Sequence, residues 1–378
     1  MKRFRPVAVA SLLLLGLPLA GLALAGRTIT PYLAFPPRTD FVAHAPFSWS
    51  VFIGLALVFL SLLAVLVRML WPVQRSSAPV ARPLPWWGWL ALVSLGLFWL
   101  LAWTRPAFLG PLRSWIFTPL WLCWIVLVNA LAFRRTGRCL LTRHPRFYLA
   151  LFPLSAVFWW YFEYLNRFVQ NWHYVGEVTR EPLSYLLHAS LAFSTVLPAV
   201  IGTLAWLWTW PGLGSRRLFW RGMPGHRRVR GALLLTIASV SLAGLGLWPD
   251  VLFPLVWVAP LLLILGLQML EGVPTVFTEL AHGNGRCLAL PALAALLCGF
   301  LWELWNVNSD PKWIYSIPFV DRFHLFEMPI LGYAGYLPFG LECLVIAALC
   351  DPRLCQHLDD LIGKDSGSAN AQERREPR

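Results

Sequence analysis

A carboxylate, an amide and two aromatic rings recur in the same order at two places in this chain of 378 residues. Each copy reads Glu-x-x-Asn, a spacer of five or six residues, and Trp-x-Tyr. We call this pattern the repeated polar corner; its members are Glu163, Asn166, Trp172 and Tyr174 in the first copy and Glu303, Asn306, Trp313 and Tyr315 in the second. Residues three apart on a helix share a face, so the acid and amide of each copy are expected to lie together.

These residue types fit acid–base chemistry beside an apolar or cationic group. A carboxylate can act as general acid or base, and Trp and Tyr faces can hold a chain or a developing positive charge. A structural explanation competes with this one, because Trp and Tyr gather at membrane interfaces for amphipathic reasons and the chain has 22 Trp. Glu163 could also pair with Arg167 one turn later. An interface belt, however, does not require Glu-x-x-Asn twice.

Two further acids follow the second copy. Glu327 comes two residues before Pro329, where the first turn of a helix would favour an acid, and Glu181 precedes Pro182 after the first copy. Glu342 is the sharper case: in a helix starting near Pro329 it would lie about 20 Å along, beyond the bilayer centre. A charge there costs at least ~2.5 kcal/mol, so Glu342 is expected to face a cavity or a partner, or to be protonated.

The segment before Glu342 carries three glycines and Pro338 between residues 332 and 340. Pro removes a helix hydrogen bond and Gly lowers the cost of unwinding, so this pattern predicts an interrupted helix. Such an interruption can mark a binding site or can serve close helix contact; both readings stay open. The sequence thus predicts catalytic roles for Glu163, Glu303, Glu327 and Glu342. It predicts substrate contacts by Asn166, Trp172, Tyr174, Asn306, Trp313 and Tyr315.

The elements that must position these residues are membrane helices. The chain is 58% hydrophobic and 13% charged, with a mean hydropathy of +0.62, whereas a soluble protein carries about a quarter charged residues. Apolar runs near twenty residues recur, so we expect an all-α, polytopic integral membrane protein with about ten transmembrane helices. The expected spans are 7–25, 49–71, 86–103, 117–133, 147–165, 183–208, 231–248, 251–270, 288–306 and 330–350.

The domain organisation predicted from these spans is two N-terminal helices followed by a duplicated four-helix unit. Several residues recur at offsets of 140 or 141, including the polar corners and Leu197-Pro198 with Leu337-Pro338. Four helices per unit would make the copies parallel about an axis along the membrane normal. The expected segments are 1–71, a cytoplasmic linker 72–85, the repeats 86–209 and 231–350 around a basic loop 210–230, and a partly disordered tail 351–378.

Charge and cysteine usage indicate the membrane and orientation. The net charge is +13, and with the N-terminus inside, most of the 31 Lys and Arg residues fall on the cytoplasmic side. We therefore expect a cell inner membrane protein with both termini cytoplasmic, an uncleaved first helix, and attraction to anionic membrane lipids in place of nucleic acid. The seven cysteines form no Cys-x-x-Cys pair, so we expect free thiols, no metal site and no cofactor.

Three functions compete on this sequence. The first is a membrane-embedded enzyme acting on an amphiphilic lipid or isoprenoid substrate at the outer leaflet, with its site between the repeats. The second is a transporter of a small polar or cationic solute, which the duplication and the interrupted last helix favour. The third is a structural membrane subunit whose polar corners fix helix ends. The clustering of polar residues at one side favours the first.

Overall fold

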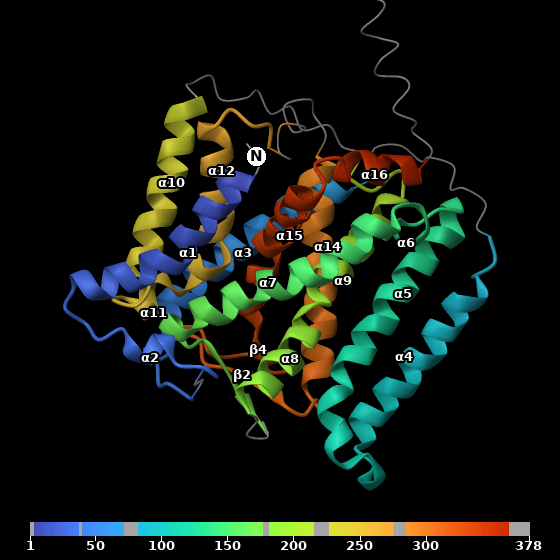
Figure 1. Cartoon of the computed structure of the whole chain (residues 1–378), viewed down its shortest axis with the longest axis horizontal. Helices are drawn as coiled ribbons and strands as arrows, with labels where there is room; N and C mark the ends of the chain where they lie inside the picture. The colour runs from blue at the N-terminus through green and yellow to red at the C-terminus, as the bar shows by residue number, and fades with distance from the viewer. Residues whose placement is uncertain are drawn as a thin grey trace, which may run out of the picture.

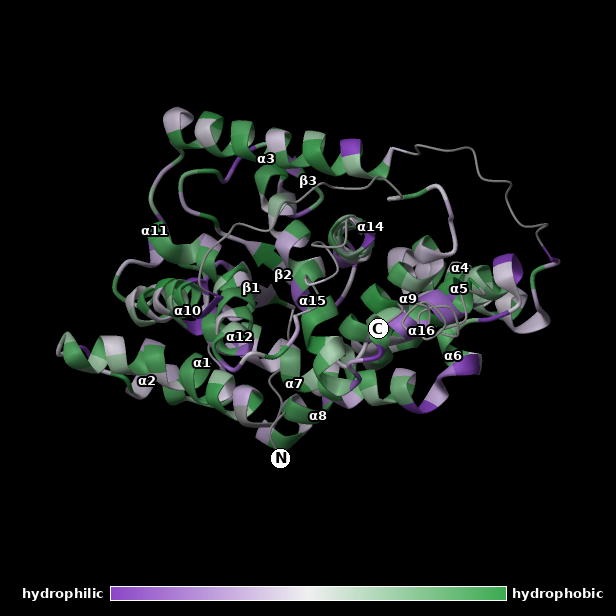
Figure 2. Cartoon of the chain, turned by 90° about the horizontal axis from the view of Figure 1, so that it is seen from above, coloured by the Kyte–Doolittle hydropathy of each residue, from purple (hydrophilic) through white to green (hydrophobic). Residues whose placement is uncertain are grey.

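The computed structural model describes residues 4–37, 40–71, 82–176, 181–214, 227–275, 278 and 285–362. It is mostly helical, and the described part also contains four short strands. Among these residues, seven helices are long and apolar enough to cross a membrane, or eight if the bent pair Pro249–Trp257 and Ala259–Leu270 is one span. Figure 2 shows the apolar character of these helices along most of their length. The chain is therefore a polytopic membrane protein.

The number of candidate spans is lower than the ten expected. Helices do form at residues 147–165 and 231–248, as α7 (Pro145–Val169) and α10 (Arg227–Gly244), but neither is among the candidates. The reason lies in their composition. The helix α10 begins with three arginines within four residues, and α7 is rich in Trp and Tyr and contains Glu163. Both helices are less apolar than a lipid-facing span requires.

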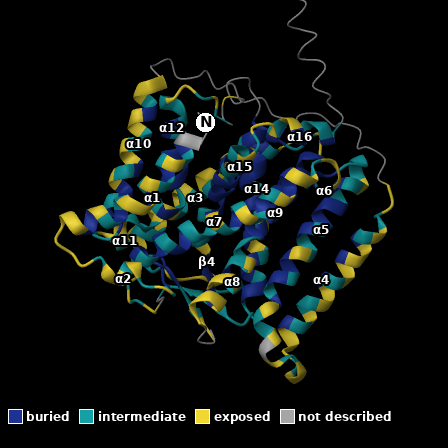
Figure 3. Ribbon diagram, in the orientation of Figure 1, coloured by how far each residue is buried: buried dark blue, intermediate teal, exposed yellow. Residues whose placement is uncertain are grey.

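The outer helices expose apolar surface, as expected of contact with lipid. The helix α3 (Trp49–Leu70) buries only Leu66 and Met69, and its Leu57 is 61% exposed. The same exposure marks α4 (Trp86–Thr104), whereas α9 (Val196–Trp208) and α14 (Arg286–Asn306) are mostly buried at the centre (Figure 3). Large apolar patches on a soluble monomer would be unusual, so this surface fits a hydrocarbon environment.

The helices of the bundle contact one another in pairs. In the first half, α4 lies against α5 (Phe117–Thr136), and α7 lies against α8 (Pro182–Phe193) and α9. In the second half, α10 lies against α12 (Ala259–Leu270), and α14 lies against α15 (Tyr336–Cys350). The halves meet where α9 contacts α14 and α15 contacts α7.

The first helix belongs to this bundle. Helix α1 (Phe4–Leu24) remains helical through Pro18 and lies against α7, α10 and α12. Leu22 is 2% exposed, and Tyr164 on α7 donates a hydrogen bond to the carbonyl of Leu15. Gly21 lies so close to the carbonyl of Ala243 that any added Cβ would clash. The sequence 4–24 therefore forms part of the folded core.

Short helices and irregular segments complete the described chain. They are α2 (Thr30–Leu33), α6 (Leu140–Arg143), α11 (Pro249–Leu252), α16 (Leu354–Leu361) and the 3₁₀ helices η1 (Ala107–Trp115), η2 (Phe253–Trp257) and η3 (Ile330–Gly335). The predictions for residues 72–81, 215–226 and 363–378, which include most of the linker, most of the basic loop and the disordered tail, lie outside the described residues.

The two ends of the bundle differ in character. Figure 1 shows the start of α1, α6 and α16 at one end, together with the arginine-rich end of α5. The four strands lie at the opposite end: β1 (Trp172–Val175), β2 (Lys312–Tyr315), β3 (His324–Leu325) and β4 (Met328–Pro329). The strands β1 and β2 follow α7 and α14, so the two polar corners lie at the same end of the molecule.

Candidate functional site

The two copies of the polar corner pair with each other directly. The strands β1 and β2 are antiparallel, with Trp172 opposite Tyr315 and Tyr174 opposite Trp313. Each Trp of one copy is therefore paired with the Tyr of the other copy. The pairing is symmetric, because exchanging the two strands leaves the same Trp–Tyr pairs. Segments separated by about 140 residues in the sequence thereby form one two-stranded sheet that joins the halves.

The two amides hold these strands to their helices. On α14, Asn306 donates from Nδ2 to the carbonyl oxygen of Trp313 at 2.7 Å and accepts from the Trp313 backbone N–H at 2.9 Å. On α7, Asn166 donates to the carbonyl oxygen of Trp172 at 2.8 Å and accepts from the Asn171 N–H at 2.9 Å. Both side chains are fully buried. We call each of these arrangements an asparagine clamp, and each fixes a Trp-x-Tyr strand against the last turn of its own helix.

The two carboxyls accept hydrogen bonds from ring groups. The Oε1 atom of Glu163 accepts from the Tyr174 hydroxyl at 2.7 Å and from the indole N–H groups of Trp159 and Trp172 at 3.1 and 3.3 Å. The Oε1 atom of Glu303 accepts from the hydroxyls of Tyr315 and Tyr336, each at 2.8 Å. In both copies, the tyrosine of the strand donates to the glutamate of the preceding helix.

Each carboxyl also keeps one oxygen without a hydrogen-bond partner. Glu163 and Glu303 are both 0% exposed, and the Oε2 atom of each has no partner among the described residues. The structural alternative, a pair between Glu163 and Arg167, is not seen, because the Arg167 guanidinium donates to the carbonyls of Tyr32 and Ala34. The pKa of the Tyr315 hydroxyl is raised well above its ordinary value, mainly by burial and next by the neighbouring Glu303 carboxyl. The phenol therefore stays protonated and acts as a hydrogen-bond donor.

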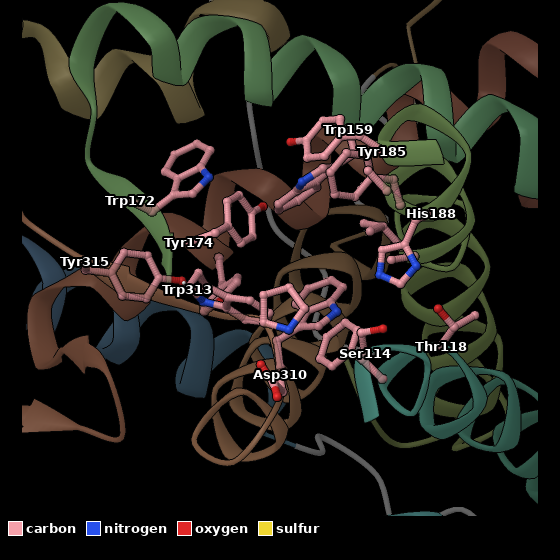
Figure 4. A pocket seen from close by; sticks show the side chains of 18 of the residues that line it. Ser114, Thr118, Trp159, Trp172, Tyr174, Tyr185, His188, Asp310, Trp313 and Tyr315 are labelled. Carbon is pink, nitrogen blue, oxygen red and sulfur yellow. Dashed lines mark hydrogen bonds between the residues drawn. The ribbon is translucent and has the colours of Figure 1, made fainter. Parts of the chain in front are cut away.

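The paired corners form part of the wall of an aromatic cavity of about 130 Å³. This is many times the roughly 10–15 Å³ that a single water requires. Figure 4 shows side chains from both halves arranged around it. Eleven of the nineteen described residues that line it are aromatic: Phe117, Trp159, Trp172, Tyr174, Tyr185, Phe193, Trp257, Trp302, Trp313, Tyr315 and Tyr336. The polar remainder includes Ser114, Thr118, His188 and Asp310.

The predicted site residues fall into three groups around this cavity. Four form part of its wall: Trp172, Tyr174, Trp313 and Tyr315. Glu163 and Glu303 lie behind the wall, hydrogen-bonded to the wall tyrosines, and Asn166 and Asn306 form the clamps. Chemistry in the cavity would therefore reach the carboxyls through the tyrosine hydroxyls.

Glu327 and Glu342 lie away from this arrangement. Glu327 was expected in the first turn of the last helix, but it occupies the turn between β3 and β4. There it forms a 2.6 Å ion pair with Lys312. Glu342 is fully buried on α15, neither of its oxygens has a hydrogen-bond partner among the described residues, and it does not line the cavity. The last helix is interrupted as predicted, because the 3₁₀ helix η3 precedes α15; Pro338, however, is the third residue of α15, where proline is tolerated.

Several wall residues were not predicted. Trp159 is four residues before Glu163, so helical spacing alone could have placed it beside the acid. Tyr336 lies within the glycine-rich segment that the sequence singled out, but nothing there indicates its bond to Glu303. Trp257, on η2, carries no local signal, because its place depends on how η2 meets the other half.

The described residues contain no group of three or more His, Cys, Asp or Glu side chains suited to a metal ion. Comparison with protein-family models, curated proteins and solved structures finds no match to this chain. The site must therefore be interpreted from its own geometry.

Proposed function

We propose that this chain is an integral membrane enzyme that acts on an amphiphilic lipid or isoprenoid substrate, with the aromatic cavity as its active site. One observation carries the proposal: in both copies, a tyrosine of the cavity wall donates its hydroxyl to a buried carboxyl. The O···O distances are 2.7 Å for Tyr174 and Glu163 and 2.8 Å for Tyr315 and Glu303. Each pair connects the cavity to a group that can store a proton.

The proposed chemistry is proton transfer to or from a bound apolar molecule. A substrate group at the wall meets the tyrosine hydroxyl first, and the carboxyl behind it supplies or takes up the balancing proton. Two such pairs in one cavity allow one to act as acid and the other as base. The indole and phenol faces would stabilise positive charge that develops on the substrate. Catalytic steps of this kind contribute roughly 10²–10⁴-fold each.

We also propose that the two halves arose by duplication of a four-helix unit and are related about an axis along the membrane normal. The self-matching register of β1 and β2 and the two asparagine clamps support this. The proposed membrane is the cell inner membrane, with both termini cytoplasmic. The arginines at the end of α5 and the start of α10 support this orientation. The cavity would then lie toward the outer leaflet.

The test compares lipid extracts from cells with and without the full-length chain. Mass spectrometry should reveal a lipid species that is consumed or formed only when the chain is present, and Glu303→Gln and Tyr315→Phe should abolish the change. Glu327→Gln is the control, because that acid pairs with Lys312 and does not line the cavity. Identical extracts with and without the chain, or full conversion by Glu303→Gln at equal protein level, would refute the enzyme proposal.

A transporter of a small polar or cationic solute is the second candidate. The position of Glu342 favours it, because a fully buried acid without a hydrogen-bond partner in a membrane helix is a common feature of ion and proton pathways. Transport predicts that single cysteines near Glu342 react with a soluble thiol reagent from both sides of the membrane under different conditions. Labelling from one side only, under all conditions, would exclude it.

A further inference from the structure

The cavity has the composition of a site for a positively charged organic group. We propose that it binds an alkylated ammonium group, either the head of an amphiphile or a free organic cation. This inference rests on the proposed function only for the location of the site, and it adds the chemical class of the ligand. The face of an aromatic ring carries partial negative charge and therefore attracts cations. Cages built from several aromatic rings recognise quaternary ammonium ligands.

The rings surround the cavity from several directions. Trp159 and Trp302 come from different halves, with ring centroids 6.4 Å apart, and Trp302 stacks on Tyr336 with centroids 6.0 Å apart. Trp172 and Trp257 form another side, with centroids 5.9 Å apart. A compact cation inside would contact several rings at once, and each such contact adds to the binding energy.

Carboxyl groups outnumber basic side chains around the cavity. The described lining residues include Asp310 and His188, and no Lys or Arg. Behind the wall, Glu163 and Glu303 each direct one oxygen to a wall tyrosine and keep the other oxygen without a hydrogen bond. The nearby cations are engaged elsewhere, Arg167 with backbone carbonyls and Lys312 with Glu327. A bound cation would stabilise the ionised form of these two buried carboxyls.

Other ligand classes fit less well. An anion would meet an aromatic wall that carries Asp310, with His188 as the one side chain among its described residues that could become positively charged. A neutral apolar chain would suit the rings, but it would gain no electrostatic attraction from the carboxyls behind the wall. The discriminating comparison is therefore between a cation and a neutral molecule of the same shape.

The experiment measures binding to the purified full chain by isothermal titration calorimetry, in phosphatidylglycerol nanodiscs that contain no ammonium lipid. The probes are choline and its uncharged isostere 3,3-dimethyl-1-butanol. Dodecyltrimethylammonium, tested beside dodecanol, distinguishes a lipid-like source from a free cation. We expect a cation to bind at least about tenfold more tightly than its neutral counterpart. Saturation by choline indicates a soluble ligand, and saturation by the alkylated cation alone indicates an amphiphile.

Two variants locate the binding. Trp302→Leu removes one ring face and should weaken cation binding at least about fivefold. Trp89→Leu is the matched control, because Trp89 is 57% exposed on the lipid-facing helix α4. The thermal midpoint of each variant is measured first, so that loss of folding is not taken for loss of binding. Equal binding of cation and neutral isostere, or no binding of any cation by the folded chain, overturns the proposal.

The outcome is separable from that of the enzyme proposal. If cations fail to bind while Glu303→Gln still alters the lipid extract, the ligand class is wrong and the enzyme proposal stands. If cations bind while the lipid extracts are identical with and without the chain, the site is real and its assignment to lipid chemistry is wrong.

Discussion

Replacing Asn306 by alanine tests the mechanical basis of the site. The change removes two side-chain hydrogen bonds, of 2.7 and 2.9 Å, to the backbone of Trp313 at a fully buried position. Each lost bond costs about 0.5–1.5 kcal/mol, and a buried backbone group left without a partner costs about 1–3 kcal/mol. We therefore expect the free energy of unfolding to fall by about 2–5 kcal/mol.

The other half provides an internal repetition of this experiment. Asn166→Ala removes bonds of 2.8 and 2.9 Å to the carbonyl oxygen of Trp172 and the N–H of Asn171, so a loss of similar size is expected. Because β1 pairs with β2, releasing one strand weakens the support of the other. The double variant should therefore lose less than the sum of the single changes, with an interaction of about 0.5–3 kcal/mol.

The assay is chemical unfolding of the detergent-solubilised chain, followed by far-ultraviolet circular dichroism. Asn308→Ala is the control, because Asn308 lies in the same loop and, within the described part of the chain, only its backbone carbonyl accepts a hydrogen bond, from Arg105. If Asn306→Ala unfolds within about 0.5 kcal/mol of both the parent and Asn308→Ala, the size expected of a neutral surface change, the asparagine clamp does not hold the strand and the reasoning fails.

Two further predictions concern packing and pH. Gly299→Ala would place a Cβ 2.4 Å from the ring of Tyr336, so we expect a loss of about 1–3 kcal/mol in unfolding free energy, whereas Gly54→Ala, with open space around it, should lose none. For pH, His144 stacks on His357 of α16, and burial first and His357 second lower the pKa of His144 below its ordinary 6.5. The folded state therefore binds fewer protons there than the unfolded state, and docking of α16 should weaken as the pH falls below 6.5. Faster modification of the buried Cys287 beneath α16, relative to free cysteine at each pH, would report this, and a constant relative rate would contradict it.

The local geometry of each polar corner could be predicted from the sequence. Helical spacing correctly placed Glu163 beside Asn166 and Glu303 beside Asn306, because three residues span nearly one turn. The expected number of membrane crossings from one corner to the other is even, so the sequence also predicted that both corners lie at the same end of the molecule. The pairing of β1 with β2 could not be predicted, because four-residue strands carry too little pattern to be recognised among so many aromatic residues.

The wider site depended on geometry that no local pattern contains. The sequence predicts a catalytic role for Glu342 and an interrupted last helix; η3 does precede α15, which begins at Tyr336, but Glu342 does not line the cavity. Glu327 was assigned to a helix start, but its ion pair with Lys312 holds it in a hairpin turn. In both cases the position of the carboxyl depends on where regular structure stops. A sequence pattern can indicate that a helix is interrupted, but it does not specify the direction in which the chain continues.

The remaining question is whether Glu163 and Glu303 are needed for anything beyond holding the corner. A glutamine has the same shape, and its carbonyl oxygen can accept the same bonds from Tyr315 and Tyr336 that Glu303 accepts. Its amide nitrogen would replace the oxygen that has no partner, at a cost of about 1–3 kcal/mol if it too stays unpaired. A purely structural role therefore predicts that Glu303→Gln lowers the free energy of unfolding by no more than about 1–3 kcal/mol and leaves every cellular effect of the chain close to that of the parent. A chemical or cation-binding role predicts that stability is kept while the lipid change or the cation affinity is lost, since only the carboxyl can exchange a proton or carry a negative charge. Measuring stability and function on one preparation separates these cases. Loss of stability together with loss of function would support neither role. Tyr336→Phe is therefore made alongside, because it shows how far the fold tolerates the removal of one hydrogen bond to Glu303.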